Sequence, residues 1–184
     1  MKIFRFGLST GFVFWALVPS LLSAGEATNQ LSGTMNAFMP MVTNTTQLVL
    51  ARFDFAEMAR RSLGPHWRSL DQGEQKQFVE GFAERLMGYY DGIVRSAGGE
   101  KIRFKREVQD GKYASVETQV ITRYGEDLPI KYWLEDVDGQ WKVYDVVIDH
   151  VGVVENFRVQ FERVIAKSSV KELLQKLKDR NPGS

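Results

Sequence analysis

Few side chains in this sequence stand in an arrangement that would carry out acid–base or nucleophilic chemistry. There are two histidines: His66 follows Gly64-Pro65 in an expected turn, and His150 stands next to Asp149 at the end of an expected strand. A histidine oriented by a carboxylate can act as a general base, but a polar residue that ends a strand is the commoner role. No His-x-x-His or Glu-x-x-His pair indicates a metal site.

Asp145 is the other candidate, because it interrupts an otherwise apolar face of its strand. In the expected register it shares a sheet face with Val143 and Val147. A carboxyl group there could be an acid–base group of raised pKa. It could also form a structural ion pair with Arg158 or Arg163 of the following helix. The structural role is favoured because nothing else in the sequence completes a catalytic set.

The composition narrows the classes of function. The 184 residues include no cysteine, which excludes disulfides, thiol nucleophiles and thiolate metal sites. With 43% hydrophobic and 26% charged residues the chain is typical of globular proteins. The formal net charge is +1 and no basic run occurs, so the electrostatic signature of a nucleic-acid-binding protein is missing. There is no Gly-rich phosphate loop and no Gly-x-Ser-x-Gly elbow.

Residues 101–150 alternate with a period of two, which predicts strands that position Asp145 and His150. The expected strands are residues 102–108, 113–124, 128–137 and 140–150. Two tight hairpins are expected, at Asp110-Gly111 and Asp138-Gly139. The resulting sheet has four antiparallel strands.

The second hairpin fixes a register. If Val137 faces Gln140, then Leu134 faces Val143, and Ile130 faces Val147. One apolar face then collects Ile130, Tyr132, Leu134, Trp141, Val143 and Val147, with Ala114, Val116, Thr118 and Val120 of the neighbouring strand. The other face carries Lys131, Glu135 and Lys142 beside Trp133 and Tyr144. We expect the first face to point to the interior.

Helices are predicted before and after the sheet. Capping boxes at residues 54–57, 71–74 and 169–172 mark three helix starts, and Gly64-Pro65 should end the first of these helices. Weaker patterns predict helices on either side of Pro40 and an apolar helix over residues 151–165. The second capped helix has a clear helical period in Phe78, Phe82, Leu86, Tyr89 and Ile93. Helices, strands and helices in this order predict an α+β domain.

Three glycines share one face of that long helix. Gly81, Gly88 and Gly92 are spaced by seven and four residues, and each costs about 1 kcal/mol relative to alanine. They either leave room for something close to the backbone, such as a ligand, or mark a kink or an end near Gly88.

The first residues have the layout of a secretory leader. Lys2 and Arg5 precede an apolar run over residues 6–22, and small residues follow at 23–27. This predicts that residues 1–24 are removed on export, with cleavage between residues 24 and 27. The alternative, an uncleaved anchor, needs about 20 predominantly apolar residues. Residues 28–180 then form one domain and residues 181–184 a disordered tail.

Five short strings, taken together and in their order, match the pattern of one known family. They are Phe53-Asp54-Phe55-Ala56-Glu57-Met58-Ala59-Arg60, Leu63-Gly64-Pro65-His66-Trp67, Gln75-Lys76-Gln77-Phe78-Val79-Glu80, Trp141-Lys142-Val143-Tyr144-Asp145-Val146-Val147 and Asn156-Phe157-Arg158-Val159-Gln160-Phe161. From about residue 52 to residue 178 the chain therefore resembles the MlaC family of periplasmic phospholipid-binding proteins, also called the toluene-tolerance auxiliary family.

The resemblance implies a four-stranded sheet curved against helices, similar to nuclear-transport-factor-2-like folds. It also implies a deep apolar pocket for phospholipid acyl chains, with the headgroup left in water. The implied partners are an outer-membrane lipoprotein–porin complex and an inner-membrane ABC transporter, between which a periplasmic monomer carries lipid. Such a carrier needs no catalytic residue, metal or cofactor. One departure is that residues 28–52 are shorter than the family's usual first helical stretch.

We therefore predict a lipid carrier, with a hopanoid carrier as a variant because a related branch of the family serves hopanoids. The rivals are a small isomerase or hydrolase of the same fold using Asp145 or His150, and a structural adaptor. Surface arginines such as Arg60 and Arg61 are candidates to meet headgroup phosphate. The predicted pocket residues are Phe82, Leu86, Tyr89, Val116, Val120, Ile130, Tyr132, Leu134, Val143, Val147, Phe157 and Phe161.

Overall fold

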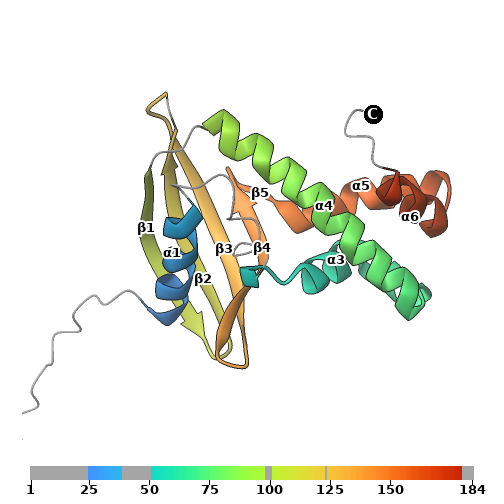
Figure 1. The fold of residues 1–184 in the computed structure, drawn as a ribbon, viewed down its shortest axis with the longest axis horizontal. Coiled ribbons are helices and arrows are strands. Elements are labelled where there is room, and N and C mark those ends of the chain that lie inside the picture. Colours follow the sequence, from blue (N-terminus) through green and yellow to red (C-terminus); the bar gives the residue numbers. More distant parts are fainter. Residues whose placement is uncertain (1–24, 39–50, 98–100, 123, 180–184) are drawn as a thin grey trace, which may run out of the picture.

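The computed structural model describes residues 25–38, 51–97, 101–122 and 124–179 (Figure 1). The predicted leader, the residues around Pro40 and the predicted tail lie outside the described residues. The elements are α1 (Glu26–Phe38), α3 (Phe55–Leu63), the 3-10 helix η1 (Gly64–Ser69), α4 (Gln72–Ala97), β1 (Lys101–Asp110), β2 (Tyr113–Ile121), β3 (Asp127–Val137), β4 (Gln140–Ile148), β5 (Val151–Gly152), α5 (Val153–Lys167) and α6 (Val170–Lys178). Helices precede and follow one antiparallel sheet, which confirms the predicted α+β class.

The sheet has five strands in the order β1-β2-β3-β4-β5, where four were predicted. The additional strand, β5, pairs with the end of β4 and comes from residues predicted to start a helix. The chain reverses through Asp149 and His150, whose positive φ angles of 46° and 66° suit a tight two-residue hairpin turn. His150 therefore lies in an exposed turn and not at the end of a strand.

The hairpin turns set the register of the longer strands. Asp138 and Gly139 form the β3–β4 turn, with φ angles of 53° and 79°, and Val137 pairs with Gln140 as predicted. The β1–β2 turn lies one residue later than predicted, at residues 111 and 112, because Asp110 pairs with Tyr113.

A β-bulge in β4 changes the register beyond its middle. Leu134 pairs with Val143 as predicted, but the next pair is Trp133 with Asp145, so Tyr144 is an extra residue in β4. An extra residue on one strand turns every later side chain of that strand to the opposite face.

The predicted pairing of Ile130 with Val147 is therefore wrong, because Ile130 pairs with Ile148 and Val147 lies opposite Lys131. Val146 and Ile148 are buried in place of Val147, which is half-buried. The apolar side chains of β4 thus step by three across the bulge before alternation resumes.

Helix α1 lies over one face of the sheet (Figure 1). Glu107 of β1 accepts a hydrogen bond from the Thr28 backbone N–H at 2.8 Å. Glu107 stands opposite Val116, and Val116 opposite Tyr132. Directly opposed residues point to the same side of a sheet, so α1 covers the apolar face.

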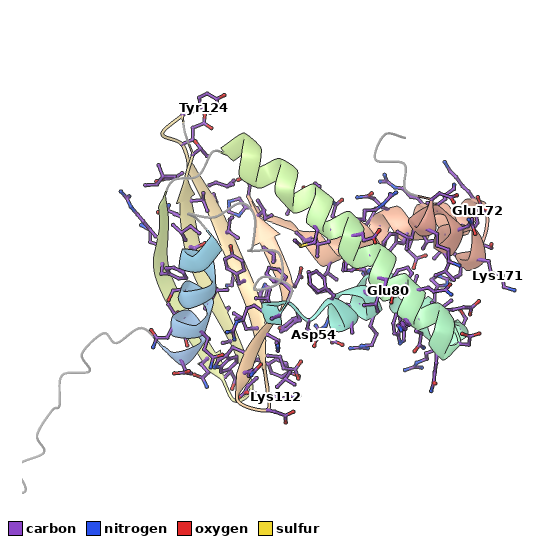
Figure 2. All side chains as sticks on the ribbon, in the orientation of Figure 1. Asp54, Glu80, Lys112, Tyr124, Lys171 and Glu172 are labelled. Carbon is purple, nitrogen blue, oxygen red and sulfur yellow. The ribbon has the colours of Figure 1, made fainter. Side chains whose placement is uncertain are left out.

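The other helices form a group beside β4 and β5, with α4 crossing α3 and α5 (Figure 1). Asp54 lies where the chain passes from the sheet to α3 (Figure 2), and its backbone N–H bonds to the Val143 carbonyl at 2.8 Å. Its Oδ1 accepts the Glu57 N–H at 2.8 Å. All three predicted helix starts are confirmed. Only Asp71 with Glu74 forms the full reciprocal capping box, whereas Asp54 and Ser169 act as N-caps alone.

Candidate functional site

The apolar face of the sheet forms a continuous wall of aliphatic and aromatic side chains. Val116, Leu134 and Val143 are completely buried, and Tyr132 is 1% exposed. They share this face because Val116 pairs with Tyr132 and Leu134 with Val143. We call the sheet wall the set Ala114, Val116, Ile130, Tyr132, Leu134, Trp141, Val143, Val146 and Ile148.

Sequence reasoning missed Val146 and Ile148 because it continued the alternation through the bulge. The residue types carry no signal for the bulge, because Val146 and Val147 are both valine and only their burial distinguishes them. Val120, the other predicted wall residue, is half-buried near the end of β2.

Helices α4 and α5 contribute a second apolar region made of aromatic rings. Phe82 contacts Phe157 with ring centroids 5.1 Å apart, and Phe78 contacts Phe161 at 5.4 Å. Phe157 and Phe161 are 5.6 Å apart. We call Phe78, Phe82, Phe157 and Phe161 the ring cluster. Leu86 is buried one turn beyond Phe82, whereas Tyr89 is 47% exposed.

Eight of the twelve predicted pocket residues fall into these two groups. Phe82, Phe157 and Phe161 meet in the ring cluster. Most of the sheet residues meet in the sheet wall, and both groups belong to one buried apolar core. Their contact with a ligand remains a prediction.

Asp145 caps a helix. Its Oδ1 accepts the backbone N–H of Val146 at 2.7 Å and that of Val154 at 3.1 Å. Val154 is the second residue of α5, whose N-cap residue Gly152 offers no side chain. A carboxylate at this position satisfies an orphan N–H and faces the positive end of the helix dipole.

The surroundings of Asp145 correct its predicted sheet face and its predicted ion pair, but agree with a raised pKa. It pairs with Trp133 and so does not share the face of Val143. The expected partner Arg158 instead forms an ion pair with Glu155 at 3.3 Å. Burial raises the pKa of the Asp145 carboxyl above its ordinary 3.8, while its two backbone hydrogen bonds and nearby Arg61 act in the opposite direction.

The histidines are far from forming a catalytic pair with Asp145. His66 Nε2 lies 3.3 Å from Glu162 Oε2, joining η1 to α5. His150 is exposed in the β4–β5 turn. Within the described residues, no group of three or more His, Cys, Asp or Glu side chains could hold a metal ion.

The two arginines proposed to meet a headgroup are engaged within the chain. Arg60 and Arg61 both pair with Glu57 at 2.6 Å, and the hydrogen bond from Arg60 is the main cause that lowers the pKa of Glu57. Arg61 also lies over the Tyr144 ring, 4.2 Å from its centroid. This contact joins α3 to the bulge of β4.

The glycines of α4 have different roles. A Cβ added at Gly81 would meet the Leu177 Cβ at 2.8 Å, so Gly81 allows α6 to pack closely on α4. At Gly88 nothing lies within 4 Å of the added Cβ. Gly92 lies in the part of α4 for which the structure describes the backbone only. The helix continues through both positions to Ala97, so the predicted end near Gly88 is wrong.

The fold and the site define an α+β protein whose antiparallel sheet presents an apolar wall to covering helices. None of the helices in the described ranges combines the length and apolarity needed to cross a membrane. The MlaC protein family model matches residues 33–179. The chain therefore belongs to the MlaC family.

Two curated relatives support the same assignment. The toluene tolerance protein Ttg2D of Pseudomonas putida is 32% identical over 89 residues, which is 48% of this chain and 41% of the relative. The intermembrane phospholipid transport system binding protein MlaC of Haemophilus influenzae is 22% identical over 120 residues, which is 62% of this chain and 56% of the relative. The matched part of the chain thus spans about half the length of these relatives.

A solved structure has the same fold. The phospholipid-binding protein of Ralstonia solanacearum, determined in complex with a phospholipid, superposes with a TM-score of 0.72. The match covers 85% of this chain and 97% of that chain at 24% identity. The likeness confirms the family fold over almost the whole of the solved chain.

Proposed function

We propose that this protein is a periplasmic lipid carrier that holds phospholipid acyl chains against the sheet wall. The observation that carries the proposal is a family fold shared with a phospholipid-bound protein, combined with a sheet face made of apolar side chains. Asp145 accepts a hydrogen bond from the first turn of α5, and this structural role favours a carrier over an isomerase or hydrolase.

The energetics of acyl chains explain why such a carrier is needed. Each methylene group removed from water is worth about 0.8 kcal/mol, so exposing two chains of about 16 carbons costs on the order of 25 kcal/mol. Lipid therefore does not cross an aqueous compartment unaided at useful rates. A protein that offers an apolar interior removes most of this cost without any chemical step.

The proposed lining corrects the predicted one at a single strand. It keeps Val116, Ile130, Tyr132, Leu134 and Val143, and takes Val146 and Ile148 in place of Val147. Phe82 and Leu86 of α4 and Phe157 and Phe161 of α5 would close the apolar space from the helical side, with Tyr89 and Val120 near its edge.

The proposed route runs between an outer-membrane lipoprotein–porin complex and an inner-membrane ABC transporter, with the carrier acting as a monomer. The Haemophilus influenzae relative is named as part of an intermembrane phospholipid transport system, and the Ralstonia solanacearum protein as a phospholipid-binding protein. Both names support the lipid-carrying part of this proposal. A hopanoid in place of a phospholipid would use the same apolar wall, and the experiment below distinguishes the two.

Native mass spectrometry of the protein purified from membrane-containing cells tests the proposal. We expect about one bound lipid per chain, identified as phospholipid or hopanoid by its released mass. Val116→Phe fills the wall and should lower the bound lipid several-fold. Val108→Phe, on the exposed side of β1, is the matched control and should retain it. A lipid-free wild-type protein under gentle conditions would overturn the proposal.

A further inference from the structure

The sheet wall is covered by the protein's own side chains. Val116, Leu134 and Val143 are 0% exposed, and Tyr132 is 1% exposed. An interior packed in this way leaves little free space, so an acyl chain can contact these residues only when a covering element moves away. Helix α1 is the covering element that stands apart from the group formed by α3 to α6 (Figure 1).

Two polar anchors hold α1 across the apolar face of the sheet. On β1, Glu107 accepts the Thr28 N–H at 2.8 Å. At the β3–β4 hairpin, Gln30 Oε1 accepts the Trp141 N–H at 3.0 Å, and Gln30 Nε2 donates to the Gly139 carbonyl at 3.3 Å. Because β2 and β3 lie between β1 and β4 in the sheet, the start of α1 passes over the wall residues of those two strands.

The apolar attachment of α1 is small. Among residues 25–33, for which side chains are described, the buried apolar side chains are those of Ala27 and Leu31. Helices α3 and α6, each nine residues long, both bury three apolar side chains. Hydrophobic stabilisation is roughly proportional to the apolar area buried, and a hydrogen bond to the protein exchanges for one to water at little net cost. Apolar packing therefore holds the described start of α1 less firmly than it holds α3 or α6.

Gln30 organises the attachment of α1 to the hairpin. Besides its two bonds to the hairpin, its Oε1 accepts Arg52 Nη1 at 2.8 Å, and its Nε2 donates to Glu26 Oε1 at 2.9 Å. Arg52 in turn donates to the Trp141 carbonyl at 3.2 Å. A single uncharged side chain thus joins α1, the hairpin and the segment that leads to α3.

We propose that α1 is a movable cover of the sheet wall, that Gln30 is its latch, and that phospholipid acyl chains enter when α1 moves off the wall. The inference deepens the proposed function and rests on it. When the cover moves, acyl methylenes take the place of Ala27 and Leu31 against the wall, so the apolar face is not left in water. The closed and the loaded forms then differ in the position of α1, and lipid shifts the population between them.

The rate of lipid uptake tests the latch. The probe is pyrene-labelled phosphatidylcholine in phosphatidylcholine vesicles, and the acceptor is the lipid-stripped protein. Gln30→Ala removes the latch and should speed uptake several-fold. Gly33→Ala, on the same helix and with nothing within 4 Å of the added Cβ, is the matched control and should keep the wild-type rate. An unchanged or lower rate in Gln30→Ala would overturn the latch.

A cross-link tests the movement of the helix. The sequence contains no cysteine, so one pair of thiols can be introduced alone. Gln30→Cys places the first on α1, and Gln140→Cys places the second on the hairpin, between Gly139 and Trp141. Before cross-linking, this chain should take up lipid faster than the wild type because the latch is lost. After a short bismaleimide joins the two thiols, uptake should fall about tenfold or more below the wild-type rate.

The same reagent on a second pair of cysteines controls for the chemistry. Glu172→Cys and Lys176→Cys lie one turn apart on the exposed side of α6, and their cross-link should leave uptake unchanged. Wild-type uptake by the chain cross-linked at α1 would overturn the cover and leave the carrier intact. A wild-type protein that takes up no lipid would overturn the carrier, and the cover with it.

Discussion

The sheet wall and the ring cluster are both apolar and buried, but their shapes depend on different interactions. The wall is set by the backbone ladder, because the pairing of Val116 with Tyr132 and of Leu134 with Val143 fixes where each side chain stands. The ring cluster has no such frame. Phe78, Phe82, Phe157 and Phe161 hold α4 and α5 together through ring-to-ring contacts.

This difference indicates which region can lose a neighbouring apolar group, such as a lipid chain, and keep its geometry. A sheet keeps its geometry when a neighbouring apolar group leaves, because main-chain hydrogen bonds hold the strands in place. Helices that meet only through side chains change their spacing when a side chain is lost. We therefore expect the ring cluster to control stability and the sheet wall to control lipid binding.

The largest effect is expected from removing a ring. Phe82→Ala should lower the free energy of unfolding by about 3–5 kcal/mol, because it removes a buried ring and leaves a cavity. Urea unfolding of the purified protein measures the loss. Tyr89→Ala, at an exposed position of the same helix, is the control and should cost less than about 1 kcal/mol. Similar losses for both variants would mean that the ring cluster does not hold α4 in place.

Bound lipid provides the next largest effect. At about 100 times its dissociation constant a ligand stabilises the folded state by about 2.7 kcal/mol, so stripping the lipid should lower the unfolding free energy by that order. Unfolding of the stripped and lipid-loaded forms measures it. The difference should shrink in Val116→Phe and persist in full in Val108→Phe. A difference that survives in Val116→Phe would place the lipid away from the sheet wall.

Asp145 joins the two regions, because it stands on β4 and caps α5. Asp145→Ala leaves the Val154 N–H without its acceptor and should cost about 1–2 kcal/mol of unfolding free energy. The bound lipid should remain, because Asp145 lies off the face of the wall. A normal stability with loss of lipid would contradict the capping role and indicate that Asp145 contributes to lipid binding.

The sequence predicted the features that depend on neighbouring residues. The three N-caps and the Asp138-Gly139 turn each depend on contacts within about four residues, and all four are present. The register derived from that turn was correct as far as Leu134 and failed beyond it. The reason is that a strand can accommodate an extra residue where another element packs on that residue.

The bulge at Tyr144 is such a place, since Arg61 of α3 lies over the Tyr144 ring. That contact joins residues far apart in the chain, so no local pattern announces it. The capping of α5 by Asp145 could not be predicted from a local pattern either, because Asp145 stands nine residues before Val154. The two-residue strand β5 is too short to show a period. The sequence therefore predicted most wall residues but assigned the far end of β4 to the wrong face.

The smallest effect is a pH dependence that sharpens the role of Asp145. Because burial raises the pKa of Asp145 above 3.8, the folded protein binds this proton more tightly than the unfolded chain does. The contribution of Asp145 to the free energy of unfolding is therefore lost as the pH rises through its pKa in the folded protein. It is regained as the pH falls toward the pKa of Asp145 in the unfolded chain.

Asp145→Asn does not titrate, so subtracting its unfolding free energy from that of the wild type cancels the other carboxyl groups. We expect the difference to shift in favour of the wild type as the pH is lowered from neutral to about 4, measured by urea unfolding at intervals of pH. A shift in the opposite direction would mean that the helix dipole and the two backbone hydrogen bonds outweigh burial. Asp145 would then bind the helix group to the sheet more strongly as an ion than as an acid, and the junction between the two regions would weaken in acid.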